Sequence, residues 1–469
     1  MRAISRAVTP PVPATSTTAT GACCRRYARP RFQSGLAAPR EGLGELPPHS
    51  MLATGALLRS LLVNAISSHR TLLTPSLWTL STIADPAKKG FVGSLLDVHR
   101  NPLLRRFLKA TVYDQFCAGQ NAAEAMETVR GIKKMGYQGV ILTYARELVD
   151  GPGEEAEDRG TEEAVAKQQI QEWYDGVMKT LEIIGKDDFL ALKFTGAGNA
   201  VAKVLEASNE PLPSQMADAI DRICDRAMER QVRIFVDAEH QSVQHSIDTI
   251  TLDMMRTFNR NGKVLVYNTY QIYLKSAPQT LLAHLKTAAA DGFAVGVKLV
   301  RGAYINSEPR YLIHDTKDDT DAAYNLVVKA LLERQYAPLG RSSIGGPLPL
   351  PFPHIELFLG THNKESVLFA HDLSETRLNT QQLTPRVQYG QLLGMADDVS
   401  CRLLQRAAIA KRAGSVPPQV YKCTSWGPLD DCLAYLVRRA VENRDAVSRT
   451  WEEYAALKAE AWRRLKTRG

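Results

Sequence analysis

Two adjacent arginines, Arg438 and Arg439, lie near the end of the chain in a segment whose sequence predicts a helix. Residues three and four positions apart share one face of a helix, so Tyr435 and Glu442 belong to the same stripe. A guanidinium group holds a carboxylate through two parallel hydrogen bonds, which suits a small carboxylated ligand. A solvated helix face with an ion pair worth roughly 0.2–0.5 kcal/mol would have the same sequence. The residues upstream must decide between these two interpretations.

Eight short apolar segments alternate with helical stretches in the part of the chain that precedes this stripe. The segments comprise residues 139–144, 189–195, 232–239, 263–270, 293–300, 354–360, 386–392 and 418–423. The helices are expected at residues 161–182, 214–230, 242–260, 275–291, 320–335, 363–373 and 395–412. This alternation predicts an α/β fold, a (β/α)8 barrel in a distorted form.

The regions around the barrel differ in composition, so we divide the chain into four parts. They are a leader (1–45), a helical region (46–135), the barrel (136–445) and an amphipathic, basic terminal helix (446–469). Two stretches inside the barrel are expected to be loops, an acidic one at 146–165 and a proline-rich one at 340–353.

Polar residues follow most of the predicted strands. In parallel barrels the catalytic groups lie at the carboxyl ends of the strands. The polar residues at those ends are Lys193, Asp237, Asn268, Lys298, Arg301, Thr361, His362, Asn363 and Tyr421. Each could simply mark a chain leaving the core, but their number favours a site. The helix with Arg438 and Arg439 follows the eighth strand, so we expect it over the same barrel mouth.

These residues also carry a family resemblance. The segments VDAEH (236–240), NTYQ (268–271), KLVRGAY (298–304), GTHN (360–363) and YGQLLGM (389–395) resemble, in order, the motifs of proline dehydrogenases. Residues 421–443, which include AYLVRRAVEN, resemble the last strand and helix of that family. The resemblance implies FAD-dependent oxidation of L-proline to 1-pyrroline-5-carboxylate, with electrons passed to a membrane quinone. It is strongest to the mitochondrial, eukaryotic branch.

Oxidation of a ring amine requires a cofactor, because no side chain accepts a hydride. The segment 196–198 has two glycines but lacks the third glycine of a dinucleotide-binding fingerprint. A flavin across a barrel mouth needs no such loop, since helix starts can bind its phosphates. Residues 320–321 and 361–363 are expected at helix starts, where capping is the alternative role.

The resemblance implies a set of flavin contacts. Asn268 matches a position that hydrogen-bonds the flavin ring, and residues 298–304 match a stretch along the cofactor. The implied contacts are Asn268, Lys298, Val300, Gly302, Ala303, Tyr304, Thr320, Thr361, His362 and Asn363. No metal site is expected, because the seven cysteines are scattered without zinc-binding spacing.

The same resemblance implies a substrate site. Arg438 and Arg439 would clamp the proline carboxylate with Lys193, each charge-assisted bond contributing about 1.5–3 kcal/mol. Lys193 could also serve as the base that takes the amine proton. Asp237 and Glu442 are the expected counter-charges. The walls around the ring would be Leu392, Tyr421 and Tyr435.

The amino terminus predicts the location of the protein. Residues 1–40 contain seven arginines and no acidic residue, which is typical of a mitochondrial transit peptide. This segment carries most of the net charge of +8, so we infer no nucleic-acid partner. Residues 51–83 have leucines at helical spacing, which fits a core helix or a helix that rests on a membrane. We expect peripheral association with the matrix side of the inner membrane.

Three other functions are compatible with parts of this pattern. A Schiff-base aldolase would use Lys193 as its nucleophile and need no flavin. A non-catalytic barrel would bind proline or a similar acid without turnover. Oxidation of 4-hydroxyproline is the nearest alternative, and Tyr421 or Tyr435, by filling the space of the hydroxyl, would favour proline.

Overall fold

The computed structural model describes residues 46–84, 101–145, 159–208, 210–340, 351–445 and 447–467. Residues from Pro47 onward form one compact unit. The predicted transit peptide (1–45) lies outside the described residues, as do residues 341–350 of the predicted proline-rich loop.

Eight parallel strands close into a barrel in sequence order, with β1 paired to both β2 and β8. The predicted (β/α)8 fold is therefore confirmed. The strands are β1 (Gly139–Tyr144), β2 (Phe189–Leu192), β3 (Arg233–Val236), β4 (Val266–Gln271), β5 (Val295–Val300), β6 (Ile355–Gly360), β7 (Arg386–Leu392) and β8 (Gln419–Trp426). The last strand runs three residues further than expected, to Trp426, which moves Tyr421 to the middle of the strand.

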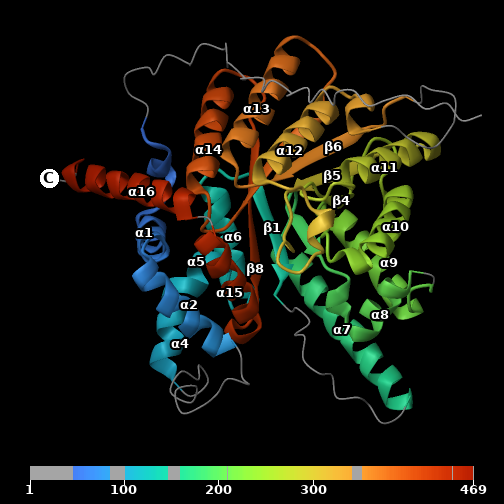
Figure 1. The fold of residues 1–469 in the computed structure, drawn as a ribbon, viewed down its shortest axis with the longest axis horizontal. Helices are drawn as coiled ribbons and strands as arrows, with labels where there is room; N and C mark the ends of the chain where they lie inside the picture. Colours follow the sequence, from blue (N-terminus) through green and yellow to red (C-terminus); the bar gives the residue numbers. More distant parts are fainter. Residues whose placement is uncertain are drawn as a thin grey trace, which may run out of the picture. The chain divides into compact units, whose positions relative to one another are not determined.

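Helices follow the strands and cover the outside of the barrel (Figure 1). They are α7 (Arg159–Ile183), α8 (Asn199–Ala207), α9 (Ser214–Arg230), α10 (Gln241–Phe258), α11 (Ala277–Asp291), α12 (Lys317–Leu332), α13 (Lys364–Asn379) and α14 (Asp397–Arg412). In α9, Met216, Ile220 and Ile223 recur at helical spacing and are fully or almost fully buried, so one face packs on the barrel. α8 was not predicted, and α7 begins at Arg159, inside the stretch expected to be a loop.

Aromatic rings fill the interior of the barrel. Alternate residues of each strand point inward, and Phe189 and Phe235 stack there with ring centroids 4.1 Å apart. Tyr267, Phe358 and Tyr421 surround them at centroid distances of 4.8–5.4 Å. Glycines make room for these rings, since a Cβ added at Gly390 would lie 2.6 Å from the ring of Phe358.

A polar network closes the amino end of the barrel beneath these rings. The guanidinium of Arg233 lies 4.1 Å from the ring centroid of Phe189 and donates to the Tyr421 hydroxyl at 2.9 Å. Glu356 lies 3.4 Å from Arg233 and accepts from the Tyr267 hydroxyl at 2.5 Å. The bottom of the barrel is thus packed and paired, which leaves the carboxyl end as the open one.

Helices from both ends of the chain lie together beside the barrel (Figure 1). The helices are α1 (Thr54–Ser68), α2 (Arg70–Ala84), α4 (Pro102–Leu108), α5 (Asp114–Phe116), α6 (Ala122–Lys134), α15 (Leu429–Asp445) and α16 (Val447–Thr467), with short turns at η1 (Pro48–Met51) and η3 (Lys109–Tyr113). α1 packs on α16, and α2 packs on α15. Leu57 and Leu457 form a small apolar cluster with Leu52 and Cys401. No described helix is both long and apolar enough to cross a bilayer.

An ion pair joins η1 to α16. The Nε2 atom of buried His49 lies 2.8 Å from Oε1 of Glu453. Burial lowers the pKa of His49, but the contact with Glu453 raises it more. The charges of Asp397 and Asp398 act in the same direction, and the net effect is a raised pKa.

We predict that His49→Gln destabilises the protein in a pH-dependent way. A histidine whose pKa is raised by folding stabilises the protein below its unfolded pKa of about 6.5, and this contribution is lost as pH rises through the folded pKa. At pH 5.5 the free energy of unfolding of the variant should be about 1–2 kcal/mol lower than that of the unmodified protein. The difference should shrink at pH 8.5. Urea unfolding at both values measures it, with exposed His354→Gln as the control; equal losses at both values would contradict the charged pair.

Candidate active site

An ion pair lies on top of the aromatic rings, toward the open end of the barrel. Lys298 on β5 donates from Nζ to Oδ1 of Asp237, which follows β3, at 2.6 Å. The ammonium also lies 4.7 Å from the ring centroid of Phe235. The side chains of Lys298 and Asp237 are 12% and 21% exposed. β3 thus presents the ring of Phe235 below and the charge of Asp237 two residues above on the same face, and Lys298 of β5 lies at the upper level.

The pKa of Tyr304 depends on the charged residues at this mouth. Burial raises the pKa of its phenol. The positive charges of Lys193 and Arg438 oppose this rise, and the negative charges of Glu239 and Asp237 add to it. Charged residues that follow β2, β3 and β8 therefore act on one phenol, which itself follows β5. The structure brings Arg438 of α15 to the same place as Lys193 and Asp237, as the sequence predicted.

Cys423 faces the same charges from β8. It lies two residues beyond Tyr421 on the inner face of the strand. Burial raises the pKa of the thiol to about 11, while the nearby charges of Lys298 and Arg439 lower it. Sequence analysis missed Cys423, because the predicted strand ended there. The alternation from Tyr421 would have revealed it if the strand had been given its full length.

The two arginines of α15 have different surroundings. Arg438 is exposed, whereas Arg439 is only 9% exposed. The guanidinium of Arg439 lies 5.0 Å from the ring centroid of buried Tyr435. Glu442 belongs to the same helix, but its side chain lies outside the described part of the structure.

Tyr421 does not line the mouth, contrary to the sequence prediction. It is 0% exposed and lies in the aromatic layer, with its hydroxyl accepting a hydrogen bond from Arg233 at the opposite end of the barrel. The error came from ending the strand at Cys423, which made Tyr421 look like a strand-end residue. Leu392, the last residue of β7, is partly buried at the mouth side of its strand.

The structure separates Asn268 from the mouth as well. Asn268 is 0% exposed, and its amide donates to Asp248 of α10 at 2.8 Å, so it faces the helices outside the barrel. The expected flavin contact of Asn268 is therefore wrong. Gln271, three residues later, has the inward parity of Tyr267. Its Oε1 accepts from the backbone N–H of Ala303 at 3.1 Å, and its amide donates to the carbonyl of Glu239 at 3.2 Å.

Glu239 is a buried carboxylate at the mouth that was not predicted from the sequence. It accepts hydrogen bonds from the backbone of Phe194 at 2.9 Å and of Thr195 at 3.2 Å, and from the Thr195 hydroxyl. Burial raises its pKa, although Thr195 and the charge of Lys193 oppose the rise. Glu239 thereby ties the loop after β2 to the loop after β3, and the VDAEH segment contained this signal.

Arg301 joins the end of β5 to two helices. It donates to Asp321 of α12 at 2.8 Å, to Thr361 at 2.5 Å and to Ser366 of α13 at 2.9 Å. Its guanidinium also lies 4.4 Å from the ring centroid of Tyr324. Burial raises the pKa of Asp321, but hydrogen bonds from Lys317 and Arg301 outweigh this and lower it overall.

Of the two predicted helix starts, the one at residues 320–321 is displaced, and the one at residues 361–363 contains a capping residue. α12 begins at Lys317, with Thr316 and Asp319 forming a capping box, so Thr320 lies inside the helix. Asn363 caps α13 by accepting from the backbone of Ser366 at 2.9 Å. For Asn363 the structure therefore shows the capping role that was the alternative.

The remaining predicted cofactor residues lie along β5 and β6. Val300 ends β5, and Gly302 and Ala303 are exposed in the loop that follows. A Cβ added at Gly302 would lie 2.3 Å from the ring of Tyr273, so only glycine lets the backbone pass there. His362 accepts from the backbone of Leu392 at 3.1 Å and so links the ends of β6 and β7.

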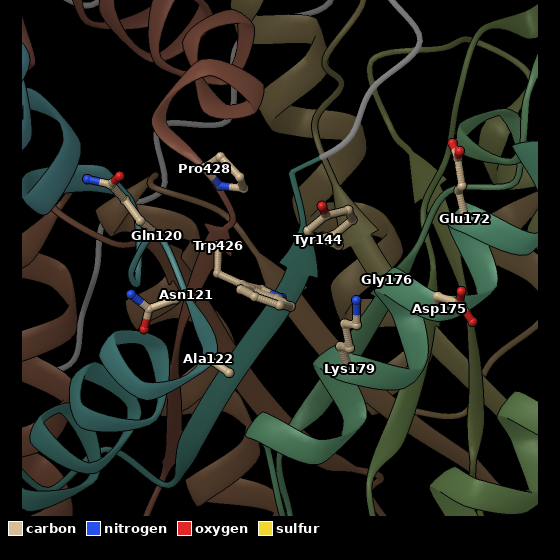
Figure 2. A pocket seen from close by; sticks show the side chains of 10 residues that line it. All are labelled: Gln120, Asn121, Ala122, Tyr144, Glu172, Asp175, Gly176, Lys179, Trp426 and Pro428. Carbon is tan, nitrogen blue, oxygen red and sulfur yellow. The ribbon is translucent and has the colours of Figure 1, made fainter. Parts of the chain in front are cut away.

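A cavity of about 460 Å³ lies outside the barrel and is not this mouth (Figure 2). Tyr144 and Trp426, the last residues of β1 and β8, line it together with Lys179 of α7 and Asn121 at the start of α6. The ring centroids of Tyr144 and Trp426 are 5.2 Å apart, and both side chains have the outward parity of their strands. The gathered charges described above lie on the opposite, inner face.

Comparison with known proteins decides the family. A family model described as proline dehydrogenase matches residues 125–452. The probable mitochondrial proline dehydrogenase of Schizosaccharomyces pombe is 30% identical over 417 residues, which cover 79% of this chain and 83% of the relative. The chain belongs to the proline dehydrogenase family. Membership supports an oxidoreductase that oxidises proline in proline catabolism.

A further relative and a solved structure also resemble this chain. Human hydroxyproline dehydrogenase is 28% identical over 463 residues, covering 88% of this chain and 91% of the relative. The proline utilization A protein of Bdellovibrio bacteriovorus, inactivated by N-propargylglycine, superposes with a TM-score of 0.59 at 16% identity. That match covers 86% of this chain but only 42% of the other, and it shows the barrel fold alone.

We predict that Arg301→Lys destabilises the protein. Lysine keeps the charge but cannot reach Asp321, Thr361 and Ser366 at once, because it lacks the planar fork. The free energy of unfolding should fall by about 1–3 kcal/mol in urea. The control is Arg222→Lys, an exposed position on α9, which should change it by less than about 0.5 kcal/mol. Equal effects of the two substitutions would contradict a tethering role for Arg301.

Proposed function

We propose that this protein is an FAD-dependent proline dehydrogenase that oxidises L-proline to 1-pyrroline-5-carboxylate, the first step from proline to glutamate. The observation that carries the proposal is the gathering of Lys193, Arg438 and Arg439 around the inner charges of a barrel whose other end is closed. A small ring with one carboxylate fits such a surface, because several cations can bind the carboxylate and fix the orientation of the ring.

The residues at the mouth fit a flavin. FAD, when bound, supplies the acceptor for the hydride, which no side chain provides. Gly302 and Ala303 leave exposed backbone beside Gln271, and Lys298 offers a positive group in the same layer. Thr361 and His362 border this region from β6. We therefore propose residues 298–304, Gln271, Thr361 and His362 as the lining of the cofactor site.

The Lys298–Asp237 pair has a distinct role in this proposal. Asp237 was expected to balance the arginines, but it contacts Lys298 directly at 2.6 Å. A paired lysine at this depth avoids the penalty of an isolated buried charge. The pair holds Lys298 Nζ in place above Phe235, while the substrate carboxylate would add the negative charge near Arg438 and Arg439.

Proline must lose a proton from its secondary ammonium before a hydride leaves readily from the adjacent carbon. Lys193 lies near Tyr304 and Glu239 on the same side of the barrel. We assign Lys193 first to the carboxylate and second to proton acceptance at its Nζ. Tyr435, packed against Arg439, would form a wall of the ring pocket.

We also propose a mitochondrial location. The relatives include the probable proline dehydrogenase of Schizosaccharomyces pombe and human proline dehydrogenase 1, both named as mitochondrial proteins, and residues 1–40 are rich in arginine. Electrons taken from proline must leave the flavin, and a membrane quinone is the proposed acceptor. This acceptor would require the protein to work on the matrix side of the inner membrane.

We predict that Arg438→Met leaves the flavin bound but raises the proline concentration for half-maximal rate by about 100-fold. Loss of two charge-assisted hydrogen bonds at about 1.5 kcal/mol each accounts for this factor. Steady-state rates with a soluble dye acceptor, together with the flavin absorbance of the purified variant, measure both quantities. The control is Arg412→Met at the exposed end of α14, which should leave both unchanged.

Spectra and borohydride trapping of the unmodified protein separate the alternative functions. Anaerobic proline should bleach the flavin spectrum of the unmodified protein. A colourless protein that borohydride traps covalently with its substrate would indicate the Lys193 aldolase instead. A protein that binds proline without bleaching would indicate the non-catalytic barrel. An unchanged proline dependence in Arg438→Met would remove the clamp from the proposal.

A specific observation favours 4-hydroxyproline as a second substrate. Of the two tyrosines expected to exclude a ring hydroxyl, Tyr421 and Tyr435, Tyr421 lies buried in the aromatic layer. The residue that faces the charges from β8 is Cys423, whose side chain is much smaller. Hydroxyproline dehydrogenases of human and rat are among the relatives, each 28% identical.

We predict that Cys423→Tyr reduces kcat/KM for 4-hydroxyproline at least about tenfold more than for proline, a difference of about 1.4 kcal/mol. A larger side chain at this position would occupy the space for a substituent on the ring. Parallel assays of both substrates measure the ratio, and Cys423→Ser, which preserves the volume, should leave it within about twofold. An unaltered ratio in Cys423→Tyr would show that β8 does not contact the ring.

A further inference from the structure

The helices beside the barrel expose large apolar side chains. On α4, Leu103 and Phe107 lie one turn apart and are 79% and 62% exposed. On α1, Leu58 and Leu62 repeat this spacing at 58% and 44%. Trp78 on α2 is 57% exposed. Single exposed apolar residues are normal on any protein, but a series on adjoining helices marks an interaction surface.

The terminal helix adds a stripe of the same kind. Trp451, Trp462 and Leu465 of α16 are 51%, 63% and 66% exposed. Positions 451, 455, 458, 462 and 465 fall on one helix face. Lys458 and Lys466 are exposed on or next to this stripe. Tryptophan beside basic residues is the composition of a helix that lies in a membrane interface.

These faces belong to one group of helices, which we call the helical flank and define as the exposed faces of α1, α2, α4 and α16. α1 packs on both α2 and α16, and the ring centroid of His69, which follows α1, lies 5.7 Å from that of Trp451. Figure 1 draws the four helices together on one side of the barrel.

The charge of the flank is mostly positive. Residues 46–84 and 101–108 contain no aspartate or glutamate, whereas they include Arg59, Arg70, Arg105 and Arg106. In α16, Glu453 pairs with His49, Glu460 pairs with Arg463 and Arg464, and Glu452 is exposed. An apolar surface on which basic residues outnumber acidic ones complements a membrane whose lipids are anionic.

We propose that the helical flank docks the protein on the surface of an anionic lipid bilayer. The proposal rests on the function proposed above, in which a lipid-soluble quinone receives the electrons. The described helices are unsuited to span a bilayer, so the contact is interfacial, with tryptophan and leucine side chains at the level of the headgroups.

The test uses the full-length flavoprotein and two double variants of the flank, Leu103→Glu/Phe107→Glu and Trp462→Glu/Leu465→Glu. The matched control is Leu383→Glu/Val416→Glu, which changes two apolar side chains that are 77% and 76% exposed away from the flank. Cosedimentation with vesicles of phosphatidylcholine and cardiolipin measures binding. We expect both flank variants to partition at least tenfold more weakly than the unmodified protein, and the control to partition as the unmodified protein does. The unmodified protein should bind pure phosphatidylcholine vesicles more weakly than vesicles with cardiolipin.

A second assay separates this proposal from the proposed function. Proline oxidation with a soluble dye acceptor should remain within twofold in all three variants, whereas turnover with a quinone in vesicles should fall in the flank variants alone. Failure of the unmodified protein to oxidise proline would overturn the proposed function. Vesicle binding by the flank variants equal to that of the unmodified protein would overturn the docking. A smaller assembly of the flank variants in size-exclusion chromatography would also overturn the docking, because it would show that the flank mediates a protein contact instead.

Discussion

Closure of the barrel is the constraint on which the rest of the structure depends. Once β1 pairs with β8, every strand must turn alternate residues inward, and a shift by one residue would move each side chain to the other face. The inner face then holds two levels, with aromatic rings below and charges above. Phe235 and Asp237 on β3 show both levels within one strand, and on β8 the neutral thiol of Cys423 lies above Tyr421 and faces the charges.

The lower level determines which end of the barrel is available for chemistry. Its rings contact one another, and Arg233, Glu356 and the tyrosine hydroxyls pair at the amino end. Charges on the upper level therefore rest on a packed, low-dielectric base, where their mutual interactions are stronger than in water. Lys298 at this boundary contacts both an aromatic ring and a carboxylate.

The sequence allowed the barrel, the strand order and the gathering of Lys193, Asp237, Arg438 and Arg439 to be predicted, because each depends on periodicity or on the strand-end rule. It did not allow the mouth residues to be chosen correctly on β4 and β8. β4 is buried on both faces, so hydrophobicity gives no alternation from which parity can be read, and Asn268 was chosen where Gln271 faces inward. On β8 the inward parity of Tyr421 was right, but the predicted strand ended three residues early, so Cys423, two residues further on the same face, was missed at the mouth.

α15 connects the two surfaces that the molecule uses in these proposals. Its inner side carries Arg439 and Tyr435, and its apolar residues form a buried cluster with Leu80 and Ile83 of α2. α2 belongs to the flank, so the proposed substrate clamp and the proposed docking surface share one packed layer of helices. Interiors packed this closely transmit displacement from one helix to the next. The side of α15 that carries Arg439 and the helices of the proposed docking surface are therefore joined by direct packing of α2 on α15.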